Sequence, residues 1–137
     1  MPRLCFALLL TGFVTNAAAD WTLMGGVTDI YSAYADKASL RRVESGHVQM
    51  WGMYNFSKPD ISVTGHTHHS TRSLREYDCS VPRVRLISFV DHAESMGTGR
   101  DITAHGDRGA RLPRRWESVV PGAVDESFWK AACGKLE

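Results

Sequence analysis

The sequence predicts an α+β domain in which an antiparallel β-sheet is followed by one C-terminal helix, with one disulfide bond joining the two. Three observations lead to this prediction. Apolar and polar residues alternate with a period of two in several segments between Trp21 and Val90. A helical period is clear only once, near the end of the chain. Two cysteines are left for a disulfide bond once an apolar leader at the N-terminus is set aside.

Residues 1–19 form that leader and have the features of a secretory signal peptide. Arg3 supplies a positive charge, a mainly apolar stretch runs from Leu4 to Val14, and three alanines precede Asp20. An uncleaved N-terminal anchor is the alternative, but a membrane-spanning helix needs about 20 apolar residues. We therefore expect cleavage after residue 19 and one exported domain at residues 20–137, with no transmembrane segment left.

The leader also contains Cys5, which lies within the apolar run instead of directly after it. A lipidated cysteine at the cleavage site is therefore not expected, and display on the surface would need another route. We expect the domain in the periplasm or at the outer cell surface.

Composition and charge narrow the class of protein. The chain has 137 residues, of which 43% are hydrophobic, with 16 Lys and Arg against 15 Asp and Glu. Arg3 is the only charged residue of the leader, so the mature domain has 15 charged side chains of each sign. A neutral chain with this apolar content is unlike a disordered protein or a coiled coil. It is also unlike a strongly basic nucleic-acid-binding protein.

Cleavage leaves Cys79 and Cys133 in a chain directed to an oxidising compartment. The obvious pairing is one disulfide bond. It closes a loop of roughly 55 residues and stabilises the folded state by about 4 kcal/mol in the chain-entropy description. A reactive thiol pair is the alternative, but the two cysteines do not form the Cys-X-X-Cys arrangement that lowers a thiol pKa.

Strands are expected where the period of two recurs between turn-forming residues. Ser45-Gly46 predicts the tight turn of a hairpin, and Asp36-Lys37-Ala38 predicts a second turn. A polar connection is expected at residues 57–65, and Gly97-Thr98-Gly99 predicts a turn ahead of a mobile Gly- and Arg-rich loop at residues 105–115. The expected strands are Trp21–Gly25, Ile30–Ala35, Leu40–Glu44, His47–Phe56, His66–Cys79 and Val84–Val90.

The segment His47–Phe56 carries large apolar residues on both faces. Val48 and Met50 fall on one face, and Trp51 and Met53 fall on the other. This pattern predicts a central strand that is covered on both sides near Trp51. Core packing is expected for Trp51 and Trp129, whereas the roles of Trp21 and Trp116 are left open.

The period changes after Pro121-Gly122. Two acidic residues then occupy a position where a helix dipole favours negative charge. The sequence predicts one amphipathic helix of about three turns, which a Cys133 to Cys79 bond would hold on the sheet. Its apolar residues follow the spacing i, i+4, i+7 and i+8, and they are Val124, Phe128, Ala131 and Ala132.

Several short motifs occur in order over almost the whole mature chain. They are Trp21, Tyr34-Ala35-Asp36, Ser39-Leu40-Arg41-Arg42, Val48 with Trp51, Glu76-Tyr77-Asp78-Cys79, Arg83-Val84-Arg85, the segment from Trp116 to Gly122, Trp129 and Cys133. Each motif is weak alone. The ordered set, behind a signal peptide and with both cysteines in place, resembles the surface-adhesin protein E family.

The resemblance implies a small exported bacterial domain with a six-stranded antiparallel sheet and a helix. The family's namesake is an outer-surface adhesin that binds host matrix and serum proteins and takes up haem. The shared motifs are of the kind that closes a fold, so they imply the architecture more directly than they imply a binding surface. A protein partner is therefore expected but not identified, and the oligomeric state is left open, with a dimer as one option.

Three histidines stand within four residues in the segment His66 to His69. If this segment is a strand, His66 and His68 share a face about 7 Å apart and His69 points the other way. Two imidazoles can supply two ligands to a divalent metal or a haem iron, while further ligands must come from elsewhere. Candidates for these are His47, His92, His105 and the many Asp residues of the chain. An exposed polar strand without a ligand is the alternative interpretation.

Catalytic signatures are not evident in the chain. It contains no Gly-X-Ser-X-Gly elbow, no His-Glu-X-X-His pair and no phosphate-binding glycine loop. Asp78 is instead expected to form an ion pair with Arg83 or Arg85. Two hypotheses follow: a non-enzymatic domain that binds a host matrix or envelope protein through a sheet face or edge, and a haem or divalent-metal binder that uses the His66–His69 cluster. A periplasmic accessory domain with no host partner is the third alternative.

Overall fold

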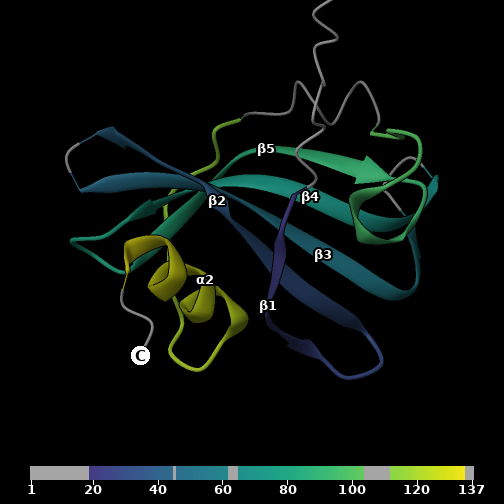
Figure 1. Cartoon of the computed structure of the whole chain (residues 1–137), viewed down its shortest axis with the longest axis horizontal. Helices are drawn as coiled ribbons and strands as arrows, with labels where there is room; N and C mark the ends of the chain where they lie inside the picture. The colour runs from purple at the N-terminus through teal and green to yellow at the C-terminus, as the bar shows by residue number, and fades with distance from the viewer. Residues whose placement is uncertain (1–18, 45, 62–64, 104–111, 135–137) are drawn as a thin grey trace, which may run out of the picture.

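The computed structural model describes residues 19–44, 46–61, 65–103 and 112–134. Six strands form one antiparallel sheet whose spatial order is the order in the sequence, and one helix follows them (Figure 1). This confirms the α+β prediction. The strands are β1 (Trp21–Val27), β2 (Tyr31–Glu44), β3 (His47–Ile61), β4 (Thr67–Asp78), β5 (Arg83–His92) and β6 (Glu117–Ser118).

The predicted turn at residues 36–38 is wrong, because β2 runs through it as one continuous strand. Asp36 pairs with Trp51 and Arg41 pairs with Gln49, so β2 holds three more residues than β3 over this stretch. The hydroxyl of Ser39 donates to the carbonyl of Asp36 (2.6 Å) and accepts from the backbone N–H of Trp51 (2.9 Å). A side chain thus replaces part of the ladder, and a bulge takes the place of a turn.

Other boundaries also differ from the prediction. β3 extends to Ile61 into the segment predicted as a polar connection, after an irregularity in its pairing with β4 that follows Asn55. After β5, a single turn of 3₁₀ helix, η1 (Ser95–Gly97), precedes Asp101, which forms an isolated bridge with His92. The predicted signal peptide lies outside the described residues except at its end, and so does most of the predicted mobile loop.

The helix, α2 (Val124–Cys133), lies against one face of the sheet and covers the core (Figure 1). Phe128 and Trp129 are buried on small residues of β2, namely Ala33 and Ala35. Gly52 of β3 permits the close approach, since a Cβ at this position would lie 3.0 Å from the ring of Phe128. The predicted alternation of β3 is confirmed: Val48 and Met50 belong to this core, and the odd-numbered residues point away from it.

The predicted disulfide bond joins Cys79, just after β4, to Cys133 at the end of α2, with the Cα atoms 5.5 Å apart. Nearby, the indole N–H of Trp129 donates to the carbonyl of Asp78 (2.8 Å). The helix ends at Gly134, whose left-handed conformation (φ 70°) suits glycine and lets its N–H bond to the carbonyl of Lys130. The end of α2 is therefore fixed to the end of β4.

Candidate binding face

The face of the sheet opposite α2 carries an aromatic surface, which we call the open face. Its position follows from the pairing, because residues directly opposite one another in neighbouring strands point to the same side. Leu23, Tyr34, Met53 and Arg72 form one such row across β1 to β4. Asp36 of β2 belongs to a second row, which also contains Trp21, Trp51 and Leu74. The open face comprises Trp21, Leu23, Tyr34, Asp36, Trp51, Met53, Arg72 and Leu74, with Glu76, Asp78, Arg83, Arg85 and Trp116 at the end beside β6.

Several of these side chains remain in contact with water. Leu23 is 61% exposed, and Trp21, Trp51 and Trp116 are each half-buried. Trp129 is in the core as predicted, but Trp51 is on the open face and is not fully covered. Among the described elements, η1 packs at one end of this face, where Met96 and Gly97 bond to Asn55 and Ser70 through their backbone N–H groups. Exposed aromatic residues on a rigid sheet are typical of protein-binding surfaces.

Arg72 lies at the centre of the open face, between two tryptophans. Its guanidinium carbon is 5.0 Å from the ring centre of Trp51 and 5.9 Å from that of Trp21. Such distances permit cation–π attraction. The stem of Arg72 runs beside Gly97, where a Cβ would lie 2.9 Å from the Arg72 Cδ atom. Within the described ranges, no carboxylate lies within ion-pair distance of Arg72.

Two buried carboxylates lie at the end of the open face that is farther from η1. Asp78 accepts from the hydroxyl (2.6 Å) and backbone N–H (2.9 Å) of Ser80 and from Arg83 Nε (2.9 Å). Glu76 pairs with Arg85 at 2.6 Å. The Ser80 hydroxyl, together with the backbone N–H groups and Arg83, holds the pKa of Asp78 well below its usual range, despite the opposing effect of burial. The predicted ion pair of Asp78 is thus confirmed with Arg83.

Trp116 covers these ion pairs from the solvent side. The guanidinium carbons of Arg83 and Arg85 both lie 4.7 Å from the ring centre of Trp116. The ring of His47 meets the same indole edge-on at 5.2 Å, and its Nε2 atom is 3.5 Å from Asp78. The sequence left Trp116 open because nothing local indicates which cations it meets. Its neighbours become visible only when the register of β3, β4 and β5 is known.

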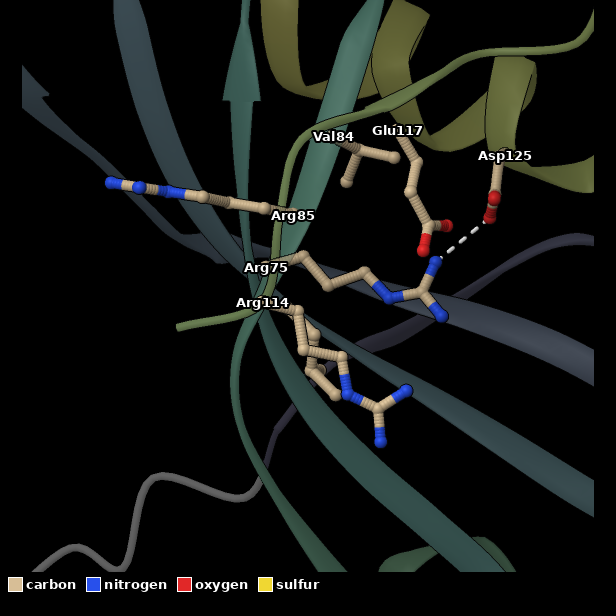
Figure 2. A pocket seen from close by; sticks show the side chains of 7 residues that line it. Arg75, Val84, Arg85, Arg114, Glu117 and Asp125 are labelled. Carbon is tan, nitrogen blue, oxygen red and sulfur yellow. Dashed lines mark hydrogen bonds and ion pairs between the residues drawn. The ribbon is translucent and has the colours of Figure 1, made fainter. Parts of the chain in front are cut away.

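Between the sheet and α2 lies a small pocket of about 110 Å³ (Figure 2). Figure 2 shows the guanidinium of Arg75 directed at Asp125, with an N–O distance of 2.8 Å, while Arg85 points away from the pocket. Arg75 also lies over the ring of Tyr54 at 5.1 Å, and burial raises the pKa of that phenol to about 12. Arg114 and Glu117 also line the pocket. The ion pair between Arg75 and Asp125 ties the first turn of α2 to β4.

The predicted histidine cluster does not converge in the structure. His66 is exposed and precedes β4, whereas His68 is buried, with Nε2 at 3.6 Å from Asp91 and its ring at 5.3 Å from that of Phe56. His69 Nδ1 lies 2.6 Å from the carbonyl of Ala93. Among the residues that the structure describes, no three His, Cys, Asp or Glu side chains are grouped to hold a metal ion. Haem or metal binding through His66 and His68 stays a prediction.

Of the other candidate ligands, His47 lies beside Asp78, at the opposite end of β4 from His68. His92 is buried at the end of β5, where it pairs with Ser70 of β4. His105 lies outside the described residues.

These features define a disulfide-bonded, single-sheet domain whose distinctive surface is an aromatic sheet face. The sequence profile of the family described as surface-adhesin protein E matches residues 21–134. The match spans most of the chain, so the chain belongs to the surface-adhesin protein E family. This confirms the resemblance inferred from the ordered motifs. A comparison with curated protein sequences found no match.

Solved structures of Haemophilus influenzae protein E share the fold. One crystal form superposes with a TM-score of 0.62 at 14% sequence identity, covering 80% of this chain and 91% of that chain. Protein E from non-typeable Haemophilus influenzae superposes with a TM-score of 0.61, also at 14% identity, over 88% of this chain and 79% of that chain. At this identity the likeness shows the architecture and not a common binding surface. No helix in the described part of the chain is long and apolar enough to cross a membrane.

Proposed function

We propose that this chain is an exported, non-enzymatic domain that binds a host matrix or envelope protein through its open face. The observation that carries the proposal is the set of partly exposed tryptophans, Trp21, Trp51 and Trp116, on the side of the sheet that α2 leaves uncovered. Membership of an adhesin family supports a binding role at the cell surface. The periplasm is the alternative location.

The open face suits binding because its side chains are already held in place. Arg72 is positioned by Trp21, Trp51 and Gly97, and Trp116 is positioned by Arg83 and Arg85. Side chains with few remaining conformations lose little entropy when a partner covers them. Tryptophan and arginine are also the residue types that most often contribute large binding energies at protein interfaces.

Binding can be tested with purified domain on sensor surfaces carrying either individual host extracellular-matrix proteins or detergent-extracted envelope proteins of the producing cell. The test variant is Leu23→Ser combined with Trp21→Ala, and the matched control is Val120→Ser, since Val120 is 62% exposed outside the open face. The proposal expects binding that the test variant loses by at least about tenfold and the control retains. Equal binding by both variants would contradict it.

Export requires a separate test, because it concerns residues before the sheet. The intact mass of the protein recovered from its own host, alkylated with and without reduction, reports both the N-terminus and the cysteines. We expect a chain that begins at Asp20, with two thiols labelled only after reduction. A retained leader with freely labelled cysteines would overturn the exported-domain proposal.

A further inference from the structure

Arg72 differs from Arg83 and Arg85, the other arginines of the open face, because those two form ion pairs. Arg83 is paired with Asp78 and Arg85 with Glu76, so the charges of these two arginines are neutralised. Arg72 has tryptophans as neighbours and forms no ion pair within the described residues. Asp36 shares the face, across from Trp51, but is not within ion-pair distance of Arg72. At the centre of the face, the charge of Arg72 is therefore not neutralised by an ion pair with any described residue.

A ligand can contact the Arg72 guanidinium through those N–H groups that are not buried. The indoles of Trp21 and Trp51 lie within cation–π distance of the guanidinium, while Nε is buried without a hydrogen-bond partner among the described residues. The remaining donors of a guanidinium lie in its plane and form a fork that matches a carboxylate. Because the stem is held beside Gly97, the fork is fixed before any ligand arrives.

Apolar surface adjoins this fork. Leu23, which is 61% exposed, stands in the same row as Arg72, and the half-buried Leu74 lies beside Trp51 in the next row. A ligand that reaches Arg72 must therefore place apolar groups next to its negative charge. An acidic side chain flanked by apolar side chains in a protein segment has this composition. A sulfated polysaccharide fits less well, since it would need several unpaired cations and the neighbouring arginines are neutralised.

Resting on the proposed function, we propose that the open face recognises a protein segment in which a Glu or Asp carboxylate binds Arg72 between Trp21 and Trp51 while apolar neighbours pack on Leu23 and Leu74. Arg72 is then the residue that determines the preference for an acidic partner. The tryptophans supply contact area, and the arginine supplies the choice between a carboxylate and its uncharged amide.

The test uses ¹⁵N-labelled full-length mature domain and two probe peptides, acetyl-Leu-Glu-Leu-amide and its Gln counterpart. Binding is followed by the indole N–H signals, with Trp21 assigned through Trp21→Phe. We expect the Glu peptide to bind about tenfold more tightly than the Gln peptide. Arg72→Met should abolish that preference while keeping the stem, and Arg72→Lys should restore only part of it. Arg42→Met, which removes an exposed arginine on another strand, β2, should keep the preference.

Several outcomes would overturn the inference. These are equal or undetectable binding of the two peptides, a Glu preference that survives Arg72→Met in a variant with an unchanged amide spectrum, and Arg72-dependent binding of a heparin hexasaccharide that exceeds that of the Glu peptide. The inference is separable from the proposed function. If Arg72→Met retains full binding to a matrix or envelope protein, the carboxylate site fails and the proposed function stands. If the wild-type domain binds no matrix or envelope protein but prefers the Glu peptide through Arg72, the proposed function fails and the carboxylate site stands.

Discussion

The two faces of the sheet are protected from water in different ways. On the helix face, Phe128 and Trp129 of α2 cover small residues of β2, and a disulfide bond fixes the covering element. On the open face, side chains cover one another: indoles lie over guanidinium groups, and Trp116 covers the ion pairs of Glu76 and Asp78. The difference indicates that residues of the helix face mainly stabilise the fold. Many residues of the open face, by contrast, can be substituted with little loss in the free energy of unfolding.

The largest effect is expected on the helix face. Phe128 is 1% exposed and fills the space above Gly52, so Phe128→Ala leaves a cavity in the core. We expect the free energy of unfolding to fall by roughly 3 to 5 kcal/mol, measured by urea denaturation with the disulfide intact. A loss below about 1 kcal/mol, the range of a surface substitution, would contradict the assignment of this face as the core.

The next effect concerns the buried carboxylate that the open face contains. Asp78→Asn removes charge-assisted hydrogen bonds to Ser80 and Arg83, and we expect a loss of roughly 2 to 3 kcal/mol at neutral pH. Because the folded pKa of Asp78 lies below its usual value of 3.8, the carboxylate stabilises the fold above that pH. This stabilisation is lost as the pH falls below about 4 towards the folded pKa.

Urea denaturation at a series of pH values checks this prediction. The difference in unfolding free energy between wild type and Asp78→Asn should be constant from pH 5 to 8 and shrink below about pH 4. A difference that grows on acidification would show that the carboxylate is not stabilised in its charged form.

A smaller effect is expected where an indole covers cations. Trp116→Ala removes contacts with Arg83, Arg85 and the ring of His47. Cation–π contacts at partly exposed sites contribute about 0.5 to 1 kcal/mol each, so we expect a loss of roughly 1 to 2 kcal/mol in urea denaturation. Trp116→Phe serves as the control and should recover about half of it. A loss as large as that of Phe128→Ala would make Trp116 part of the core.

The smallest effect on stability should accompany an effect on binding. Leu23→Ser alters a side chain that is 61% exposed on the edge strand, so we expect a change within about 0.5 kcal/mol in the thermal or urea transition. Val120→Ser should behave alike in stability. The two variants should differ when the binding partner is added, because only Leu23 belongs to the open face. A Leu23→Ser variant that unfolds readily would remove the contrast between the faces.

Much of the fold could be predicted from the sequence because the signals are local. The alternation in β3 and the spacing of Val124 and Phe128 each report on a few consecutive residues, and the cysteines left one pairing. The bulge in β2 could not be predicted, since the residues that usually mark a turn are instead accommodated by the hydroxyl of Ser39, which bonds across to β3. The residues at 36–38 indicated that the strand is interrupted, but they did not indicate whether the interruption is a turn or a bulge.

The candidate site was less predictable, because it depends on which residues face one another across strands. Arg72 is separated from Trp51 by a hairpin and from Trp21 by two strands, and no short motif connects the three. The histidines of residues 66–69 illustrate the opposite case. They formed the most visible motif, yet His68 is turned into a buried site beside Asp91 while His66 remains at the surface.

The order of the strands has a consequence for how the chain acquires its structure. Each strand pairs with its neighbour in sequence, so the sheet can assemble progressively from the N-terminus as the polypeptide emerges. The helix follows all six strands in the sequence, yet it packs on β1, β2, β3 and β4 and carries one of the two linked cysteines. Until it arrives, the apolar side of a nearly complete sheet is bare and open to association with other chains. Docking of α2 on the sheet is therefore the step that decides whether a folding chain closes its core or associates with other chains.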